Sequence, residues 1–405
     1  MPFKETCAME ERIALFREYD SGAFTVGALC ARYGISCQTF YAWKRRRADG
    51  GERWFEDKSH AAGSCPHATD GRLVERVIAL RRKYPHFGPK KIKAVLENET
   101  RELGNGVMWP AASTIGDILK RAGLVEAKRR RRRAIPQGEI VAPATAPNEE
   151  WAMDFKGWFR TLDGKRTDPL TITDTVSRYL IELRIAEQTL AGVRGALERV
   201  FQEIGLPEAI RCDNGMPFGS RSGLSALGVW WLKLGIEPRY IPPSSPQHNG
   251  RHERMHRTLK KETSNPPAMT AAEQQARFDV FRCYYNEERP HEAIGQVAPA
   301  RLWTPPERKL PTQLDDPWYD ADHEVRRVFP LGQIKWRGEM IFISEALAGE
   351  IIGLAETETG GHIVRYFRRD LGVIGRDRRF LRFAPPRARL RAAQETAADS
   401  RTISE

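Results

Sequence analysis

Residues 151–183 read WAMDFKGWFRTLDGKRTDPLTITDTVSRYLIEL, and this stretch decides the fold. Three short apolar runs, 151–155, 170–174 and 179–183, have the length and composition of strands. Asp163-Gly164, between the first two runs, is a hairpin turn signal. The stretch therefore predicts three consecutive antiparallel strands.

The residues that follow extend this pattern into a mixed sheet. A helical stretch at 191–204 leads into another strand-like run at 209–213. Antiparallel strands followed by alternating helix and strand predict an α/β domain whose mixed sheet is covered by helices. This order puts Asp154 on the first strand and Asp213 at the carboxyl end of a later one, where α/β sheets build their ligand sites.

A third acid, Glu253, lies where a Pro-rich, Gly-containing loop enters a helix. Helical spacing predicts one face that carries this acid together with cationic and polar side chains: Glu253, His256, Arg257 and Lys260. Met255 and Leu259 share another face. Three carboxylates within a few ångströms of one another repel unless divalent cations neutralise them. Mg²⁺ prefers oxygen ligands, and two such ions can promote hydrolysis of a phosphodiester.

Four motifs in order carry a family resemblance: Trp151-x-x-Asp154, Cys212-Asp213-Asn214-Gly215-x-Pro217-Phe218, SPQHNGRHERMHRTL at 245–259, and Tyr285-Asn286-x-x-Arg289-Pro290-His291. Over about 148–310 the chain resembles the integrase-core transposases of bacterial insertion sequences, a group related to retroviral integrases. The resemblance implies a ribonuclease H-like fold. It also implies an Asp-Asp-Glu triad, here Asp154, Asp213 and Glu253, that is catalytic and binds two Mg²⁺ ions, with Mn²⁺ as a substitute.

The chain departs from the family pattern in two ways. The interval between Asp213 and Glu253 is longer than in the best-known relatives, and 219–223 is a plausible place for the extra loop residues. The zinc-binding His/Cys domain of retroviral integrases is lacking, so the kinship is with bacterial transposases.

The first residues predict a helix-turn-helix DNA-binding domain at 1–60. Gly34 marks a tight turn, and Ser36 is a suitable N-cap between two short helices. The second of these helices would present four side chains to a major groove: Gln38, Thr39, Tyr41 and Lys44. Arg45, Arg46 and Arg47 would then contact phosphates. The alternative is an ordinary three-helix bundle with Phe40 and Trp43 in its core.

A second helix-turn-helix-like DNA-binding domain is predicted at 68–127. Gly88-Pro89 starts one of its helices and Ser113 can cap another. Between the two domains, His60, Cys65 and His67 suggest zinc, but no fourth ligand stands at a familiar spacing.

The charge of the chain favours a polyanionic partner. The 405 residues carry a net charge of +12, and 128–133 is a run of six consecutive cations. This run begins a basic, Pro-rich linker at 128–147, whose charge DNA phosphates would neutralise. We expect DNA contacts at the following residues of the linker and the catalytic domain: Lys128, Arg129, Arg130, Arg131, Gln247, Asn249, Arg257 and Lys260. For Gln247 and Asn249, loop or capping roles are equally compatible.

The sequence argues against a membrane or secreted protein. No segment approaches the roughly 18 apolar residues that a membrane span requires. The start lacks an apolar signal region, and the six cysteines are scattered without a C-x-x-C pair. We therefore expect a bacterial cytoplasmic location, associated with the nucleoid.

Short strand-like runs separated by Gly-containing turns predict a small β-barrel at 320–385. An Arg-rich stretch at 368–391 suggests that this module contacts the DNA backbone; a packing or oligomerisation domain is the alternative. The last residues, 386–405, are expected to be a disordered tail.

Three features invite other interpretations. His252-Glu253-Arg254-Met255-His256 spells the H-E-x-x-H signature of zinc proteases, which zinc content would test. Asp174 is a candidate fourth acid, although an Asp at this place more often closes a turn. Trp230 and Trp231 are most simply core residues.

The sequence thus predicts a multidomain DNA transposase with a catalytic domain at 148–310. It would bind the terminal inverted repeats of a mobile element, hydrolyse a phosphodiester at each end, and join the 3′-hydroxyl to target DNA. Holding two double-stranded ends requires at least a homodimer. The alternative is a non-catalytic, transposase-derived DNA-binding regulator.

Overall fold

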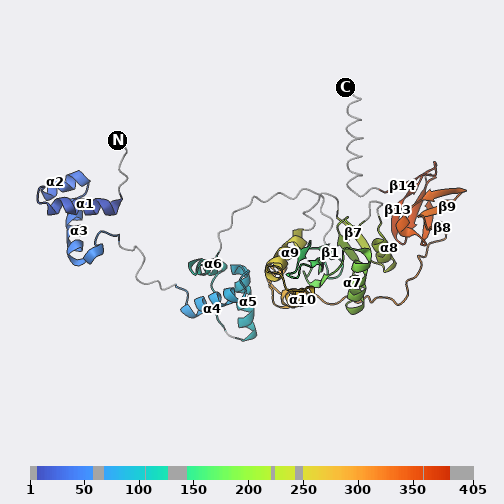
Figure 1. The fold of residues 1–405 in the computed structure, drawn as a ribbon, viewed down its shortest axis with the longest axis horizontal. Helices are drawn as coiled ribbons and strands as arrows, with labels where there is room; N and C mark the ends of the chain where they lie inside the picture. Colours follow the sequence, from blue (N-terminus) through green and yellow to red (C-terminus); the bar gives the residue numbers. More distant parts are fainter. Residues whose placement is uncertain are drawn as a thin grey trace, which may run out of the picture. The chain divides into compact units, whose positions relative to one another are not determined.

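The computed structural model describes residues 7–57, 68–104, 106–125, 144–219, 224–241, 250–358 and 360–383. The chain divides into two compact units, Met1–Asp70 and Gly71–Glu405 (Figure 1). Among the described residues, no helix combines the length and apolar character needed to cross a membrane.

The first unit is a three-helix domain. It contains α1 (Ala8–Asp20), α2 (Val26–Tyr33), α3 (Cys37–Asp49) and the short η1 (Gly51–Arg53). Gly34 ends α2 in the left-handed conformation, with φ of 66°. Ser36 then caps α3, because its Oγ accepts a hydrogen bond of 3.0 Å from the Thr39 amide. The predicted turn and cap are confirmed, and Phe40 is fully buried in the core of this unit.

The second unit begins with three more helices, α4 (Gly71–Lys83), α5 (Pro89–Glu102) and α6 (Ala112–Arg121). Pro89 stands at the start of α5 as predicted. The predicted cap at Ser113 is wrong, because α6 already begins at Ala112 and the preceding Ala111 has no side chain that can cap. The connections 84–88 and 103–111 are longer than the usual three- to four-residue turn, so the helix-turn-helix character of this module stays a prediction.

A mixed five-stranded sheet forms the centre of the second unit, as predicted. Its strands and helices are β1 (Trp151–Phe155), β4 (Pro169–Asp174), β5 (Leu180–Ile185), α7 (Leu190–Glu203), β6 (Ala209–Cys212), α8 (Ala226–Lys233), β7 (Glu237–Tyr240), α9 (Gly250–Thr263) and α10 (Ala271–Glu287). The strand order is β5-β4-β1-β6-β7. The β1–β4 and β4–β5 pairs are antiparallel, whereas β1–β6 and β6–β7 are parallel. Asp163-Gly164 forms the turn of a small extra hairpin, β2 (Phe159–Arg160) and β3 (Arg166–Thr167).

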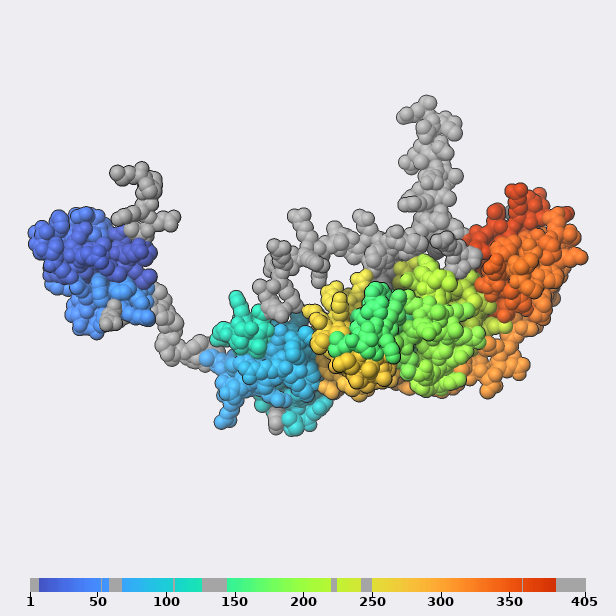
Figure 2. Space-filling view, in the orientation of Figure 1, coloured from blue at the N-terminus to red at the C-terminus, as the bar shows by residue number. Residues whose placement is uncertain are grey.

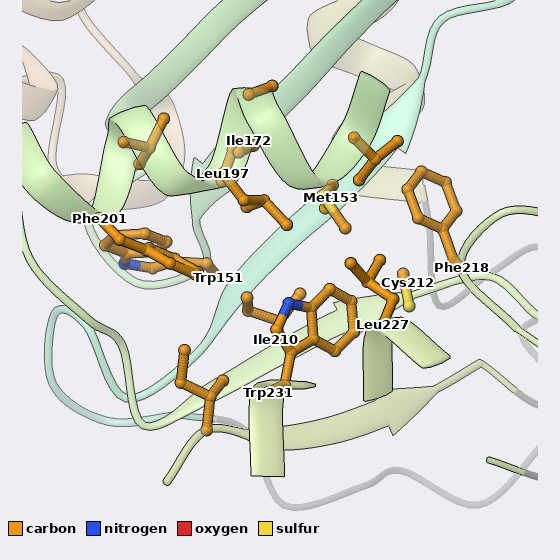
Figure 3. Packing of buried hydrophobic residues seen from close by; sticks show 14 of the residues in the cluster. Trp151, Met153, Ile172, Leu197, Phe201, Ile210, Cys212, Phe218, Leu227 and Trp231 are labelled. Carbon is orange, nitrogen blue, oxygen red and sulfur yellow. The ribbon is translucent and has the colours of Figure 1, made fainter. Parts of the chain in front are cut away.

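Helices cover both faces of this sheet. On one face, Trp151 and Met153 of β1 pack with apolar side chains of α7 and α8 (Figure 3). On the other, β5 packs against α9 and α10 through residues such as Leu183, Met255 and Phe278. Because side chains alternate along a strand, Asp154 faces the side opposite to Met153, toward α9.

Seven further strands make up the C-terminal part: β8 (His323–Arg327), β9 (Gln333–Trp336), β10 (Glu339–Phe342), β11 (Ile351–Glu356), β12 (His362–Tyr366), β13 (Arg369–Ile374) and β14 (Phe380–Arg382). They form a five-stranded sheet, β14-β13-β12-β11-β8, and a separate β10-β9 pair. The predicted closed barrel is not confirmed, because β14 and β8 remain edges of an open sheet.

The C-terminal sheets share a hydrophobic core with α8. Val229 and Leu232 of α8 are buried in the same cluster as Ile352 and Val364. Lys233 also pairs with Glu350 at 2.8 Å. Figure 2 shows the C-terminal strands in direct contact with the central domain.

Several predictions fall outside the described residues. They concern the possible zinc ligands His60, Cys65 and His67, the basic residues Lys128, Arg129, Arg130 and Arg131, the loop residues Gln247 and Asn249, most of 219–223, and the tail at 386–405.

Candidate active site

Asp154 and Asp213 are brought together by the parallel pairing of β1 and β6. Trp151 is the partner of Ile210 and Ala152 the partner of Arg211. Asp154 and Asp213 lie two residues beyond the last of these pairs, so the same register, if continued, would set them side by side on the face toward α9. The thiol of Cys212 has a raised pKa, first because it is buried and then because of the negative charges of Asp213 and Asp154. Both carboxylates therefore lie near the end of β6.

The turn after β6 fits closely around Asp213. The Gly215 amide donates a 3.0 Å hydrogen bond to Asp213 Oδ1, and Asn214 Nδ2 donates to the Ile241 carbonyl at 2.5 Å. A Cβ atom at Gly215 would lie 3.2 Å from Asp213 Oδ2, which is tighter than usual contact. Partial burial raises the pKa of Asp213, and the Gly215 hydrogen bond opposes this effect.

One hydroxyl group attaches α9 to the sheet beside Asp154. Thr171, the partner of Asp154 on β4, donates its hydroxyl hydrogen to the Asp154 carbonyl at 2.9 Å. The same Oγ1 lies 2.7 Å from His252 Nε2 and 2.8 Å from His256 Nε2. A hydroxyl can donate once and accept twice, so these contacts fit two neutral imidazoles that each donate from Nε2.

Both histidines are held in their neutral form. Burial is the main cause of the lowered pKa of His252, followed by the charges of His256 and Arg211. Burial and then the charge of Lys156 lower the pKa of His256 to about 4. His256, which helical spacing puts on the face of Glu253, turns its ring inward to Thr171, whose hydroxyl supplies a buried acceptor.

Glu253, Arg257 and Lys260 lie on the exposed side of α9. No group of three or more His, Cys, Asp or Glu side chains in the described ranges is arranged so that it could hold a metal ion. The structure thus joins Asp154 and Asp213 at neighbouring strands and leaves Glu253 exposed in the first turn of α9. Its membership in the triad stays a prediction.

Basic side chains surround the carboxyl end of β1. Lys156, directly after β1, has a pKa lowered by burial and by the positive charge of Lys260. The charges of Lys156 and Lys260 therefore act on each other, and Lys156 follows Asp154 by two residues. Such a concentration of positive charge suits a phosphodiester substrate.

Asp174 is a structural residue. Its Oδ1 accepts hydrogen bonds from the Ser177 amide at 2.7 Å and the Ser177 hydroxyl at 2.6 Å, and its Oδ2 accepts one from the Asn148 amide at 2.8 Å. The carboxylate closes the turn between β4 and β5, as the sequence suggests for an Asp at this place. Trp230 and Trp231 are likewise buried in the core.

The first unit exposes most of its candidate DNA contacts along α3. Gln38, Thr39, Tyr41, Lys44 and Arg45 are exposed. The Thr39 hydroxyl bonds to Ser36 Oγ at 2.8 Å, and Lys44 Nζ donates to the Tyr19 hydroxyl at 2.5 Å.

The other two arginines of α3 already have partners within the unit. Arg46 donates to the Glu56 carbonyl and lies over the Trp43 ring at 4.4 Å. Arg47 forms a two-bond ion pair with Asp20 at 2.9 and 2.7 Å. The expected phosphate contact of Arg47 must therefore compete with Asp20.

Sequence reasoning missed Thr171 as a part of the site. A signal was present, because two histidines four residues apart on the inner side of a helix need buried partners. The alternation of Thr171 and Thr173 along β4 supplies them: Thr173 Oγ1 lies 3.4 Å from His252 Nδ1.

Comparison with known domain families gives three matches. Residues 144–246 and 234–299 match two models described as integrase core domains, and residues 11–61 match a helix-turn-helix domain. The two integrase-core matches together span the elements that carry Asp154, Asp213 and Glu253.

Proteins of insertion elements are among the relatives. The insertion element IS407 uncharacterized 31.7 kDa protein of Burkholderia multivorans is 28% identical over 234 residues, which cover 57% of this chain and 80% of that protein. The insertion element IS476 uncharacterized 39.2 kDa protein of Xanthomonas euvesicatoria is 27% identical over 239 residues, which cover 57% of this chain and 64% of that protein.

Solved structures of viral integrases are also similar. The HTLV-2 integrase catalytic core domain in complex with magnesium is 14% identical over 40% of this chain and 99% of that chain, with a TM-score of 0.32. A chain of the simian T-cell lymphotropic virus intasome is 16% identical over 76% of this chain and 99% of that chain, with a TM-score of 0.35.

Proposed function

Since this chain belongs to the integrase-core superfamily of insertion-sequence transposases, we propose that it is a DNA transposase. It binds the terminal inverted repeats of a mobile element, cleaves at the ends of the element, and joins the 3′-hydroxyl ends to target DNA. The observation that supports the proposal is the parallel β1–β6 register, which, continued by two residues, would set Asp154 beside Asp213.

We assign catalysis and metal binding to Asp154, Asp213 and Glu253. Their oxygen atoms match the preference of Mg²⁺, and Mn²⁺ would substitute. The raised pKa of Asp213 supports the assignment, because burial disfavours the charge of its carboxylate. The hydrogen bond that opposes this effect comes from the neutral Gly215 amide. A divalent cation would supply the missing compensation.

Two metal ions held by these carboxylates would activate the attacking water or hydroxyl and stabilise the leaving oxygen of the phosphodiester. The chain itself orients the reacting strand. Lys156 and Lys260 provide positive charge beside Asp154, where a phosphate of the DNA would lie. Thr171 and the two histidines hold the first turn of α9 next to β1, which fixes the backbone of Glu253.

The other parts of the chain bind and pair the DNA ends. We assign the recognition of terminal repeats to α3, through its exposed residues Gln38, Tyr41 and Arg45. We assign further DNA contacts to the cations of the linker and, in the catalytic domain, to Gln247, Asn249 and Arg257. Two ends must be held in one complex, so the active form is at least a dimer. The nucleoid in the bacterial cytoplasm is where this substrate occurs.

The test is an end-cleavage and strand-transfer assay with purified protein, Mg²⁺ or Mn²⁺, and DNA that contains the ends of the element. Asp154→Asn should abolish both nicking and joining and leave sequence-specific binding unchanged. Asp279→Asn is the matched control, because it removes an exposed carboxylate on α10 and retains an oxygen that can accept from Gln275.

Two outcomes would reject parts of this proposal. Retained joining by purified Asp154→Asn protein would reject the assignment of this residue. Binding of the ends by wild-type protein without cleavage in either metal would support the alternative, a non-catalytic DNA-binding regulator derived from a transposase.

A further inference from the structure

A small cavity lies on the α9 side of the sheet, and three of its ten lining residues are arginines. Its volume is about 30 Å³, and its walls come from β1, the end of β4, the turn after β4, β6, the first turn of α9, and α10. We call it the arginine cavity and define it by Arg178, Arg211, Arg251, Thr175 and Tyr285. These residues come from four separate stretches of the sequence, and none belongs to the proposed triad.

The positive charge of the arginine cavity is only partly compensated by the protein. Arg211 pairs with Glu150 at 3.1 Å, and Arg251 donates to the Thr175 carbonyl at 3.2 Å. Within the described residues, the guanidinium of Arg178 has no hydrogen-bond or ion-pair partner. Arg178 therefore carries a half-buried charge that lacks a counterion.

The carboxylate in the wall, Asp174, forms no direct ion pair with Arg178. Both oxygens of Asp174 already accept hydrogen bonds, from Ser177 and from the Asn148 amide. Rotating it toward Arg178 would break the turn that joins β4 to β5. The charge of Asp174 raises the pKa of Arg178 by less than the charges of Arg251 and Arg254 lower it.

A buried hydroxyl of the cavity also lacks a partner. Thr175 is 4% exposed, and its Oγ1 makes no hydrogen bond with any described residue. A buried hydroxyl without a partner costs free energy, so such groups usually bind a ligand or water. Thr175 and Arg178 thus offer two donor groups to the same small space.

Neighbouring cations increase the demand for an anion. Burial, followed by the charges of Arg251 and Arg254, lowers the pKa of Arg178 to about 10. Burial lowers the pKa of Arg211, whereas the charge of Glu150 raises it. The positive charges of Arg251 and Arg239 lower it further. Like charges gathered in a partly buried space are stabilised when an anion enters it.

We propose that the arginine cavity binds an oxyanion of the phosphate class, held by Arg178 and the Thr175 hydroxyl, and that in the working protein this oxyanion is a backbone phosphate of bound DNA. The second half of the proposal rests on the proposed function. Ala152 and Thr173 border the cavity, and they lie two strand positions, about 7 Å, from Asp154 and Thr171 on the same face. A phosphate held here would fix the DNA strand relative to the acids.

The first experiment uses the full chain and inorganic phosphate. Phosphate should raise the thermal unfolding midpoint more than potassium chloride at equal ionic strength. Arg178→Gln should weaken the apparent phosphate affinity by about tenfold or more, because it removes a charged donor. The matched control is Arg337→Gln, because Arg337 also has a positive φ (48°) and lies over Trp336 in the β9–β10 hairpin.

Thr175→Val is a second variant that does not depend on removing charge. Because Thr175 Oγ1 has no partner among the described residues, the variant should be as stable as wild type without phosphate. It should nevertheless bind phosphate about threefold to tenfold more weakly. A phosphate effect that is equal in wild type, Arg178→Gln and Thr175→Val would overturn the proposal.

The second experiment measures DNA binding as a function of salt. If one phosphate contact is lost, Arg178→Gln should reduce the slope of log affinity against log salt by about 0.9, and Arg337→Gln should leave it unchanged. Wild-type end cleavage together with an unaltered slope in Arg178→Gln would reject the DNA contact and leave the proposed function intact. A wild-type protein that binds phosphate through Arg178 but neither binds nor cleaves the ends would reject the proposed function and keep the cavity as a site for free phosphate.

Discussion

At the scale of single residues, Thr171 connects the strand of Asp154 to α9. Its hydroxyl links β1, β4 and two turns of α9 through three hydrogen bonds. The H-E-x-x-H sequence therefore serves a packing role here: its two rings meet at a threonine, with centroids 4.9 Å apart.

We predict that Thr171→Val destabilises the second unit by about 2–4 kcal/mol, because two buried imidazole donors lose their acceptor. Thr171→Ser keeps the hydroxyl and should cost less. Urea unfolding of both variants at pH 7.5 checks this expectation. Equal stability of the valine and serine variants would contradict the role of the hydroxyl.

A second residue-scale prediction concerns His291 and acid. Burial, then the positive charges of Lys91, Arg289 and Arg178, lower the pKa of His291 to about 3. Between this value and the ordinary 6.5, the unfolded chain binds the proton and the folded chain does not, so stability falls as the pH falls through this window. Each proton taken up contributes up to about 1.4 kcal/mol per pH unit.

His291→Gln should therefore reduce the loss of stability between pH 6.5 and pH 5, as measured by urea unfolding at each pH. His86→Gln is the control, because His86 is exposed in the connection between α4 and α5. The same pH slope in wild type and His291→Gln would show that this imidazole is not held neutral by the fold.

At the scale of elements, α3 depends on its cap. We predict that Ser36→Ala destabilises the first unit by about 1 kcal/mol, because the Thr39 amide loses its acceptor. Ser36→Asn retains a capping oxygen and should be close to wild type. Thermal unfolding of the full chain, followed by circular dichroism, distinguishes the two variants, and an unchanged alanine variant would mean that α3 does not need the cap.

The strands and helices of the central domain could be predicted from the sequence because each has its own local pattern. The apolar runs at 151–155 and 170–174 and the turn at Asp163-Gly164 are readable without tertiary context. The inward rotation of His256 is not, because it depends on Thr171, which lies 85 residues away. The same reason hides the arginine cavity: Arg178 and Arg211 each look like ordinary surface cations until the fold joins them.

The open C-terminal sheet shows another limit of local patterns. Short strands with glycine turns indicate antiparallel pairing, and every pairing in this module is antiparallel. Closure depends on whether the first and last strands meet, and no local signal encodes that. Here Tyr319, before the module, instead donates to the Ile351 carbonyl in β11.

At the scale of the whole molecule, the two compact units should unfold independently. Leu29 is fully buried in the first unit, and Leu232 is 5% exposed in the core that α8 shares with the C-terminal sheets. Each substitution to alanine should cost about 2–5 kcal/mol within its own unit. Hydrogen exchange of the full chain should show that Leu232→Ala increases exchange in the central and C-terminal strands together, and that Leu29→Ala affects only α1, α2 and α3.

Exchange that increases in the C-terminal strands alone, with β1 and β6 unaffected by Leu232→Ala, would contradict a shared core. Increased exchange in β1, β6 and the C-terminal strands together would establish that the central domain and the C-terminal part form one cooperative unit.

The double burial of α8 also restricts how chimaeras of this protein can be built. Six of its eight residues are buried, with Leu227 and Trp231 in one core and Val229 and Leu232 in the other. Grafting the C-terminal module of a relative would pack side chains of a different sequence against one face of α8. The opposite face of α8 packs in the same core as β6, the strand that precedes Asp213. A successful graft must therefore carry the matching face of α8 with it.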